Sequence, residues 1–208
     1  MRILAFSDLH CDREAANRLV LESVNADIVV GAGDFGICGE RSTELFDILK
    51  EISVPFLLVS GNHDVRSELT SYCSVQDNMF LLDGSSCDIY GVTFFGLGGE
   101  IPARSTAPWN ETLDENSAAQ LLLDAPTHQV LVTHTPPYGY CDLQQDGTHE
   151  GSEAITSAIN HHTPLLCLCG HIHHSWGSVQ QLGKTLVNNL GPEPCWHSIQ
   201  SSVLHKPG

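Results

Sequence analysis

Short apolar runs alternate with amphipathic stretches over the first third of the chain. Strands are predicted at residues 3–6, 27–30 and 56–59, because each is a short, largely apolar run. Between them, one helix begins near Asp12 and places on one face Ala15, Ala16, Leu19, Val20 and Val24. The next helix has Ser42 or Thr43 as its cap and an apolar face of Leu45, Phe46, Leu49 and Ile52. This alternation predicts an α/β fold with parallel strands and right-handed crossovers.

Closely spaced strands follow at residues 79–82, 86–90 and 92–96, separated by Asp83-Gly84 and by Gly91. This spacing predicts hairpins or a meander, in which a second sheet begins. Residues 98–112 form a long loop, and Thr112 with Glu115 makes a capping box for a helix to about Leu123. Strands at 130–133 and 165–168 flank a helix at 152–160, and a hairpin at 179–182 and 185–187 precedes a last strand at 199–204. We expect one domain over residues 1–208.

Five polar motifs directly follow apolar runs, and they are Asp8-Leu9-His10, Gly33-Asp34, Gly61-Asn62-His63-Asp64, His134 and Gly170-His171-Ile172-His173. Loops at the carboxyl ends of strands converge on one crevice in α/β sheets, so these motifs are expected to meet. Carboxylate, imidazole and carboxamide groups form the mixed N/O set that Mn, Fe, Zn or Co accepts. The sequence therefore predicts a site for two divalent metal ions, with Asp34 as the carboxylate that bridges them.

Composition narrows the class of partner. The chain has 25 acidic and 9 basic residues and a formal net charge of -16. Because nucleic-acid polymers and anionic membranes require clusters of Lys and Arg, we expect neither as a partner and predict a small substrate instead. The eight cysteines include no Cys-x-x-Cys pair, and the chain begins with a strand pattern rather than a signal peptide. These features favour a cytoplasmic protein.

The five motifs, in this order, resemble the signature of the calcineurin-like metallophosphoesterase superfamily. The resemblance implies a four-layer αββα sandwich of two mixed sheets. It also implies that one metal ion is held by Asp8, His10, Asp34 and His173, and the other by Asp34, Asn62, His134 and His171. In that family pattern, His63 is a general acid that protonates the departing alkoxide, while a metal-bridging hydroxide attacks in line from the opposite side.

Departures from the family's branches narrow the substrate further. The Asp that supports the catalytic His in protein Ser/Thr phosphatases, and their phosphate-binding Arg, fall here on Ile37 and Cys38. A protein phosphatase is therefore disfavoured, and the absence of a Tyr near Asp34 disfavours a purple acid phosphatase. Asp64 is the candidate that replaces the missing support, as a second catalytic residue, or else stabilises only its own loop.

The chain is most similar to small prokaryotic phosphoesterases with His-x-Pro-Pro-x-Gly and His-x-Gly-Ser elements, here at residues 134–139 and 149–152. Arg66 and His149 are the candidate substrate contacts, and Trp109 is either a lid or an anchor of its loop. Since a phosphodiester monoanion needs less cationic help than a monoester dianion, the leading hypothesis is a dimetal-dependent phosphodiesterase. The alternatives are a phosphomonoesterase for a small substrate and a non-catalytic, metal-binding interaction scaffold.

Overall fold

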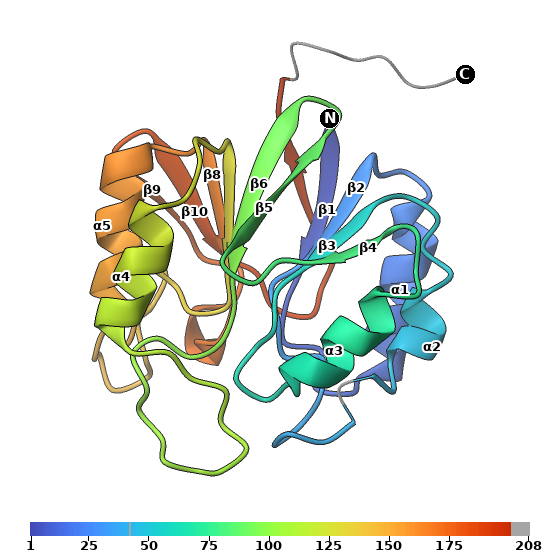
Figure 1. Ribbon diagram of the computed structural model, residues 1–208, viewed down its shortest axis with the longest axis horizontal. Helices are drawn as coiled ribbons and strands as arrows, with labels where there is room; N and C mark the ends of the chain where they lie inside the picture. The colour runs from blue at the N-terminus through green and yellow to red at the C-terminus, as the bar shows by residue number, and fades with distance from the viewer. Residues whose placement is uncertain (42, 201–208) are drawn as a thin grey trace.

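The computed structural model describes residues 1–41 and 43–200. Two β-sheets lie face to face in the middle of the molecule (Figure 1). The first sheet has the strand order β11-β1-β2-β3-β4, with β1 Arg2–Phe6, β2 Ile28–Gly31, β3 Phe56–Leu58, β4 Met79–Leu81 and β11 Cys195–Ser198. The second has the order β5-β6-β7-β8-β10-β9, with β5 Ser85–Ile89, β6 Val92–Leu97, β7 Val130–Thr133, β8 Leu166–Cys169, β9 Val179–Leu182 and β10 Thr185–Asn189.

Both sheets are mixed, as the family resemblance implied. The neighbours of β2, β3, β7 and β8 run parallel to them, whereas β11, β5 and β9 each pair antiparallel with one neighbour. Strands β1, β2, β7 and β8 are buried on both faces, which explains why they read as continuous apolar runs in the sequence.

Helices cover the outer face of each sheet and complete four layers (Figure 1). The first sheet carries α1 Arg13–Ser23, α2 Phe46–Leu49 and α3 Arg66–Cys73; the second carries α4 Glu115–Leu123 and α5 Glu153–His162. Three apolar seams hold the layers together, one under each set of helices and one between the sheets, where Ile3, Val30 and Leu57 pack in the same cluster as Val132 and Leu168. No helix in the described part of the chain is long and apolar enough to cross a membrane.

The first helix begins as predicted, because the Asp12 carboxylate accepts hydrogen bonds from the Glu14 and Ala15 backbone N–H groups at 2.9 and 3.0 Å. The prediction of its apolar face is wrong at the C-terminal end of the helix, because Val24 is 75% exposed. The second helix is only four residues long and has no side-chain cap, so Thr43 does not cap it, and residue 42 lies outside the described residues. Its apolar face is nevertheless buried as expected, at Leu45, Phe46, Leu49 and Ile52.

Other expectations are corrected by contacts between distant segments. Strand β4 pairs parallel with β3 and so belongs to the first sheet, whereas the second sheet begins with the β5–β6 hairpin. Helix α3 was not predicted. The cap of α4 is Asp114 rather than Thr112, and the Glu115 carboxylate instead accepts from the Ser152 hydroxyl and the Ala154 N–H at 3.0 and 2.8 Å, at the start of α5. The last described strand is 195–198, and residues 201–204 of the predicted one lie outside the described residues.

Candidate metal centre

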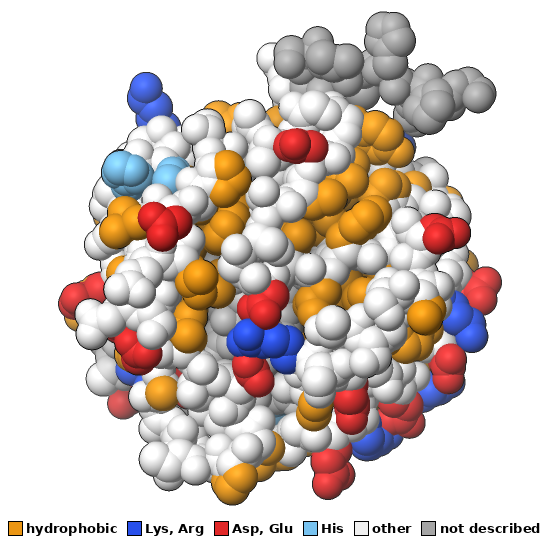
Figure 2. Space-filling view, viewed as in Figure 1, with side chains coloured by type: hydrophobic (Ala, Val, Ile, Leu, Met, Phe, Trp, Pro, Cys, Tyr) orange, Lys and Arg blue, Asp and Glu red, His pale blue; other side chains and the backbone are white. Residues whose placement is uncertain are grey.

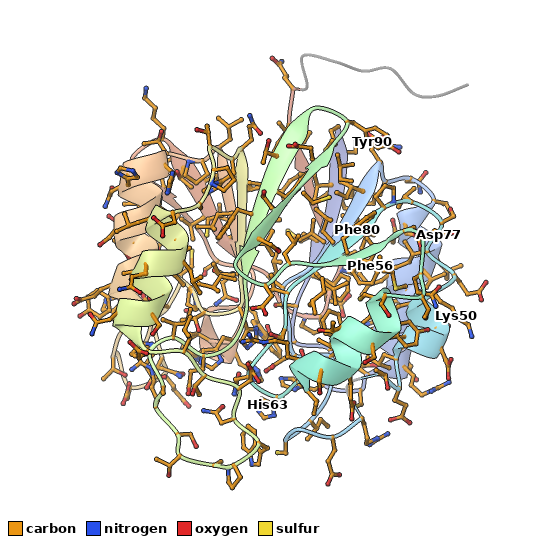
Figure 3. All side chains as sticks on the ribbon, in the orientation of Figure 1. Lys50, Phe56, His63, Asp77, Phe80 and Tyr90 are labelled. Atoms are coloured by element: carbon orange, nitrogen blue, oxygen red, sulfur yellow. The ribbon has the colours of Figure 1, made fainter. Side chains whose placement is uncertain are left out.

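The predicted ligands lie at one edge of the sandwich, where loops leave the carboxyl ends of strands in both sheets; His63 marks this edge in Figure 3. The loops after β1, β2 and β3 carry Asp8, His10, Asp34 and Asn62, and those after β7 and β8 carry His134, His171 and His173. Backbone hydrogen bonds join the loops within each sheet, from Asp8 N–H to the Gly33 carbonyl and from Gly170 N–H to the His134 carbonyl, both at 2.9 Å. The centre therefore straddles the two sheets.

Four of these side chains stand on backbone in the left-handed region, which non-glycine residues rarely adopt. The φ angles are 55° at Asp8, 43° at His10, 59° at Asp34 and 69° at His171. Such a conformation costs on the order of 1 kcal/mol or more per residue, and it persists only where the surrounding structure fixes it. Clustering of this strain on four neighbouring side chains marks the edge as a functional site.

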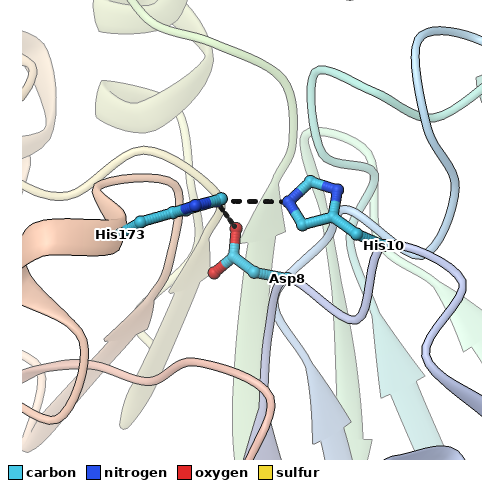
Figure 4. A group of neighbouring side chains, drawn as sticks. All are labelled: Asp8, His10 and His173. Carbon is cyan, nitrogen blue, oxygen red and sulfur yellow. Dashed lines mark hydrogen bonds and ion pairs between the residues drawn. The ribbon is translucent and has the colours of Figure 1, made fainter.

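Asp8, His10 and His173 form the first group of donor atoms (Figure 4). The Nε2 atoms of His10 and His173 are 3.2 Å apart, and His173 Nε2 lies 3.7 Å from Asp8 Oδ1. The His10 Nδ1–H donates to the Gly36 carbonyl at 3.2 Å, which leaves the His10 Nε2 lone pair facing this group. Two imidazole nitrogens and a carboxylate oxygen that converge this closely form a mixed N/O donor set that fits a divalent cation.

A second group of donor atoms comprises Asp8, Asp34 and His134, so it shares Asp8 with the first group. Asp34 also reaches toward the first group. Its Oδ2 is 3.5 Å from His10 Nε2 and 3.4 Å from His134 Nε2, while its Oδ1 accepts from the His63 backbone N–H at 2.8 Å. The loop after β3 can approach this closely only because residue 61 is glycine, since a Cβ there would lie 2.0 Å from Asp34 Oδ1. Asp34 Oδ2 lies at nearly the same distance from an imidazole nitrogen of each donor group.

His134 is fully buried and has acceptors on both sides of its ring. Its Nδ1–H donates to the Ala32 carbonyl at 2.8 Å, and its Nε2 faces the Asn62 carbonyl oxygen at 3.0 Å as well as Asp34. Burial alone would lower the pKa of His134, but the charge of Asp34 and its hydrogen bond raise it to about 9. The same pairing lowers the pKa of Asp34, although burial acts in the opposite direction. A cation bound here would take the place of the proton on His134.

Two residues outside the sequence motifs, Glu100 and Asn110, connect the predicted ligands Asn62 and His171 of the second ion. The Asn62 Nδ2 donates to Asn110 Oδ1 at 2.8 Å, Asn110 Nδ2 donates to Glu100 Oε2 at 2.7 Å, and Glu100 Oε1 lies 3.5 Å from His171 Nε2. Burial alone would raise the pKa of Glu100, but hydrogen bonds from the His171 ring and its other partners lower it to about 2. This chain of contacts turns the Asn62 oxygen toward His134 and leaves the His171 Nδ1 for a ligand.

His63 is held by its backbone surroundings. The Cys38 N–H donates to His63 Nδ1 at 2.9 Å, so the ring proton resides on Nε2. The Trp109 indole packs on the imidazole with the ring centroids 4.6 Å apart, which makes Trp109 an anchor of the 98–112 loop over His63. Partial burial lowers the pKa of His63, and the nearby charge of Asp34 opposes this only in part.

Asp64 does not contact the His63 ring, so the expectation that it supports that ring is wrong. Its carboxylate accepts from the backbone N–H groups of Asp34, Phe35, Gly36 and Gly61, at 2.9, 3.0, 2.8 and 2.8 Å. Burial and the charge of Asp34 raise the pKa of Asp64 to about 6, and the hydrogen bonds oppose that shift. Asp64 is thus a clamp between the loops after β2 and β3, whereas the alternative hypothesis confined its role to its own loop.

The two predicted substrate contacts have different surroundings. Arg66 is bound in ion pairs with Asp83 at 2.9 Å and Glu111 at 2.5 Å, so its guanidinium is neutralised rather than offered to a phosphate. Figure 2 shows other basic side chains beside acidic ones at the right-hand edge of this face. His149 instead lines a pocket, where its Nδ1 is 2.6 Å from Asp142 Oδ1.

Comparison with known proteins agrees with this geometry. The protein-family sequence model described as the calcineurin-like phosphoesterase superfamily domain matches residues 1–205 of this chain. A UPF0046 protein of Caenorhabditis elegans is 26% identical over 90% of this chain and 69% of its own length, and a Synechococcus protein named a probable cyclic nucleotide phosphodiesterase is 25% identical over 82% and 66%. A crystal structure of a Thermus thermophilus protein is 25% identical with a TM-score of 0.73, covering 91% of this chain and 88% of that one. The chain belongs to the calcineurin-like phosphoesterase superfamily.

Proposed function

We propose that this chain hydrolyses a small phosphodiester with the help of two divalent cations. The observation that carries the proposal is the position of Asp34 Oδ2, 3.5 Å from His10 Nε2 in one donor group and 3.4 Å from His134 Nε2 in the other. Two divalent cations, when bound, neutralise phosphoryl charge and lower the pKa of water toward about 7, so that hydroxide is available as a nucleophile for in-line attack. Asp8, His10, Asp34 and His173 are the proposed ligands of one ion, and Asp34, Asn62, His134 and His171 those of the other.

His63 is the proposed general acid. Because its Nδ1 accepts the Cys38 N–H, its proton is on Nε2, the atom free to face a departing oxygen. The Trp109 ring and the hydrogen bond from Cys38 fix the orientation of the imidazole, which the family's supporting Asp does in other branches. Asp64 acts on this step only by holding the loops together.

The charges around the centre favour a diester over a monoester. Acidic side chains line it, and the nearby arginines are already engaged. Arg66, at the start of α3, is paired with two carboxylates, and Arg41, in the loop after β2, with Glu44. Arg104 donates to the Glu150 and Gly151 carbonyls at 2.7 and 3.2 Å. A monoester dianion would therefore find little positive charge beyond the two cations, whereas a diester monoanion needs less. The name of the Synechococcus relative, a probable cyclic nucleotide phosphodiesterase, points the same way.

The test compares bis-p-nitrophenyl phosphate with p-nitrophenyl phosphate on metal-stripped protein refilled with Mn²⁺. We expect metal-dependent cleavage that favours the diester and falls by a factor on the order of 10²–10⁴ in His63→Ala with both metal ions retained. His161→Ala, which removes an exposed imidazole at the end of α5, is the matched control. Preference for the monoester would replace this proposal with a phosphomonoesterase. Inactivity on both substrates with two ions bound would favour the non-catalytic scaffold.

A further inference from the structure

A pocket of about 500 Å³ shares a wall with the metal centre. It is lined by residues 141–143, 149, 174–178 and 180. Trp176 forms the shared wall, because its indole N–H donates to Asp8 Oδ2 at 3.1 Å and its ring packs on His173 with centroids 4.2 Å apart. Residue Trp176 as a whole is still 36% exposed. A group bound in this pocket would therefore lie next to two predicted metal ligands.

His149 is oriented in this pocket by a buried carboxylate. Asp142 is 1% exposed, and its Oδ2 accepts from the Gly139 and Gly151 backbone N–H groups, both at 2.9 Å. Its Oδ1 takes the Nδ1–H of His149 at 2.6 Å. In the neutral ring, His149 Nε2 is consequently a hydrogen-bond acceptor, and no hydrogen bond to it is found among the described residues.

The chemistry of the lining selects an uncharged, aromatic group with N–H or O–H donors. No Lys or Arg lines the pocket in the described part of the chain, so a second phosphate finds no counter-charge there. Trp176 offers a partly exposed aromatic surface for stacking, and His149 Nε2 offers a polar contact. The volume lies within the range of small-molecule sites.

We propose that this pocket binds the nucleoside half of a nucleotide phosphodiester, with the base against Trp176 and a base or sugar donor hydrogen-bonded to His149. The inference rests on the proposed diesterase function and names its substrate class. His149 is then a residue that determines specificity, and the residues that carry out the hydrolysis remain those of the metal centre.

The test uses two diesters with the same leaving group, thymidine 5′-(p-nitrophenyl phosphate) and ethyl p-nitrophenyl phosphate. We expect the wild-type kcat/KM to be at least about tenfold higher for the thymidine ester. His149→Ala should reduce that preference by about three- to tenfold, mainly through KM, which corresponds to one lost hydrogen bond. His161→Ala should leave the preference unchanged, and His149→Gln, which restores an acceptor, should recover part of it.

Binding of thymidine itself, followed by ligand-observed NMR, tests the pocket without catalysis. We expect saturable binding that weakens in His149→Ala and persists in His161→Ala. Equal turnover of both diesters with no thymidine binding would overturn the pocket inference and leave the diesterase proposal intact. If neither diester is cleaved, the proposed function fails, and the thymidine measurement still decides whether the pocket binds a nucleoside.

Discussion

Replacing Asp64 by Ala tests whether this residue is a structural clamp. Its carboxylate accepts from four backbone N–H groups at 2.8–3.0 Å, and it is 1% exposed, so the substitution leaves four buried donors without an acceptor. An unmade buried hydrogen bond costs about 1–3 kcal/mol. Even the lower figure gives about 4 kcal/mol in total, a large part of the roughly 5–15 kcal/mol by which domains are stable.

That loss corresponds to a decrease in Tm of roughly 8–16 °C for a domain of this size. The assay is thermal unfolding followed by circular dichroism at pH 8, where Asp64, with a pKa of about 6, is ionised. Both proteins are metal-stripped, so that a change in metal affinity does not contribute. Asp77→Ala is the control, because Asp77 lies far from His63 in Figure 3, and it should change the stability by less than about 0.5 kcal/mol. A Tm for Asp64→Ala within about 3 °C of wild type would refute the clamp.

Three further predictions concern the candidate metal centre and its surroundings. Asn110→Ala should weaken binding of one of the two metal ions by about 10–100-fold in a chelator competition, since it frees the Asn62 carboxamide, and unchanged affinity for both ions would contradict this. The raised pKa of His134 stabilises the metal-stripped protein below pH 6.5, and that contribution disappears as the pH rises through about 9. Metal affinity measured by calorimetry should accordingly rise between pH 7 and 9 with release of a proton, and a flat profile would exclude His134 as a ligand. Arg66→Ala should keep kcat/KM for bis-p-nitrophenyl phosphate within about twofold, and a larger loss would show that Arg66 leaves Glu111 to bind substrate.

The strands other than β11, and the meeting of the five polar motifs at one edge, could be predicted from sequence, because both depend on local pattern. Central parallel strands are buried on both faces and so are apolar throughout, and a polar residue directly after such a run falls at the sheet edge. That rule does not mark Glu100, because two glycines separate it from the end of β6.

The errors arose where non-local contacts decide the structure. Helix α3 is eight residues long and buries only Leu69 and Cys73, too few positions to give a clear period. Glu115 matches a capping box, but its carboxylate caps α5, which is distant in sequence. The support of His63 comes from the Cys38 backbone N–H, and a backbone donor leaves no trace in residue type.

The division of the ligands between the two sheets makes any bound cation a cross-link. Asp8, Asp34 and Asn62 belong to the first sheet, and His134 and His171 to the second, while the seam between the sheets is otherwise apolar. A metal ion that joins these loops would fix the position of one sheet relative to the other at the edge where the loops lie. At a free concentration of 1,000 times Kd, each ion stabilises the fold by about 4 kcal/mol. If the proposed ions bind, removing them should therefore lower the stability of the fold as well as any activity of the centre.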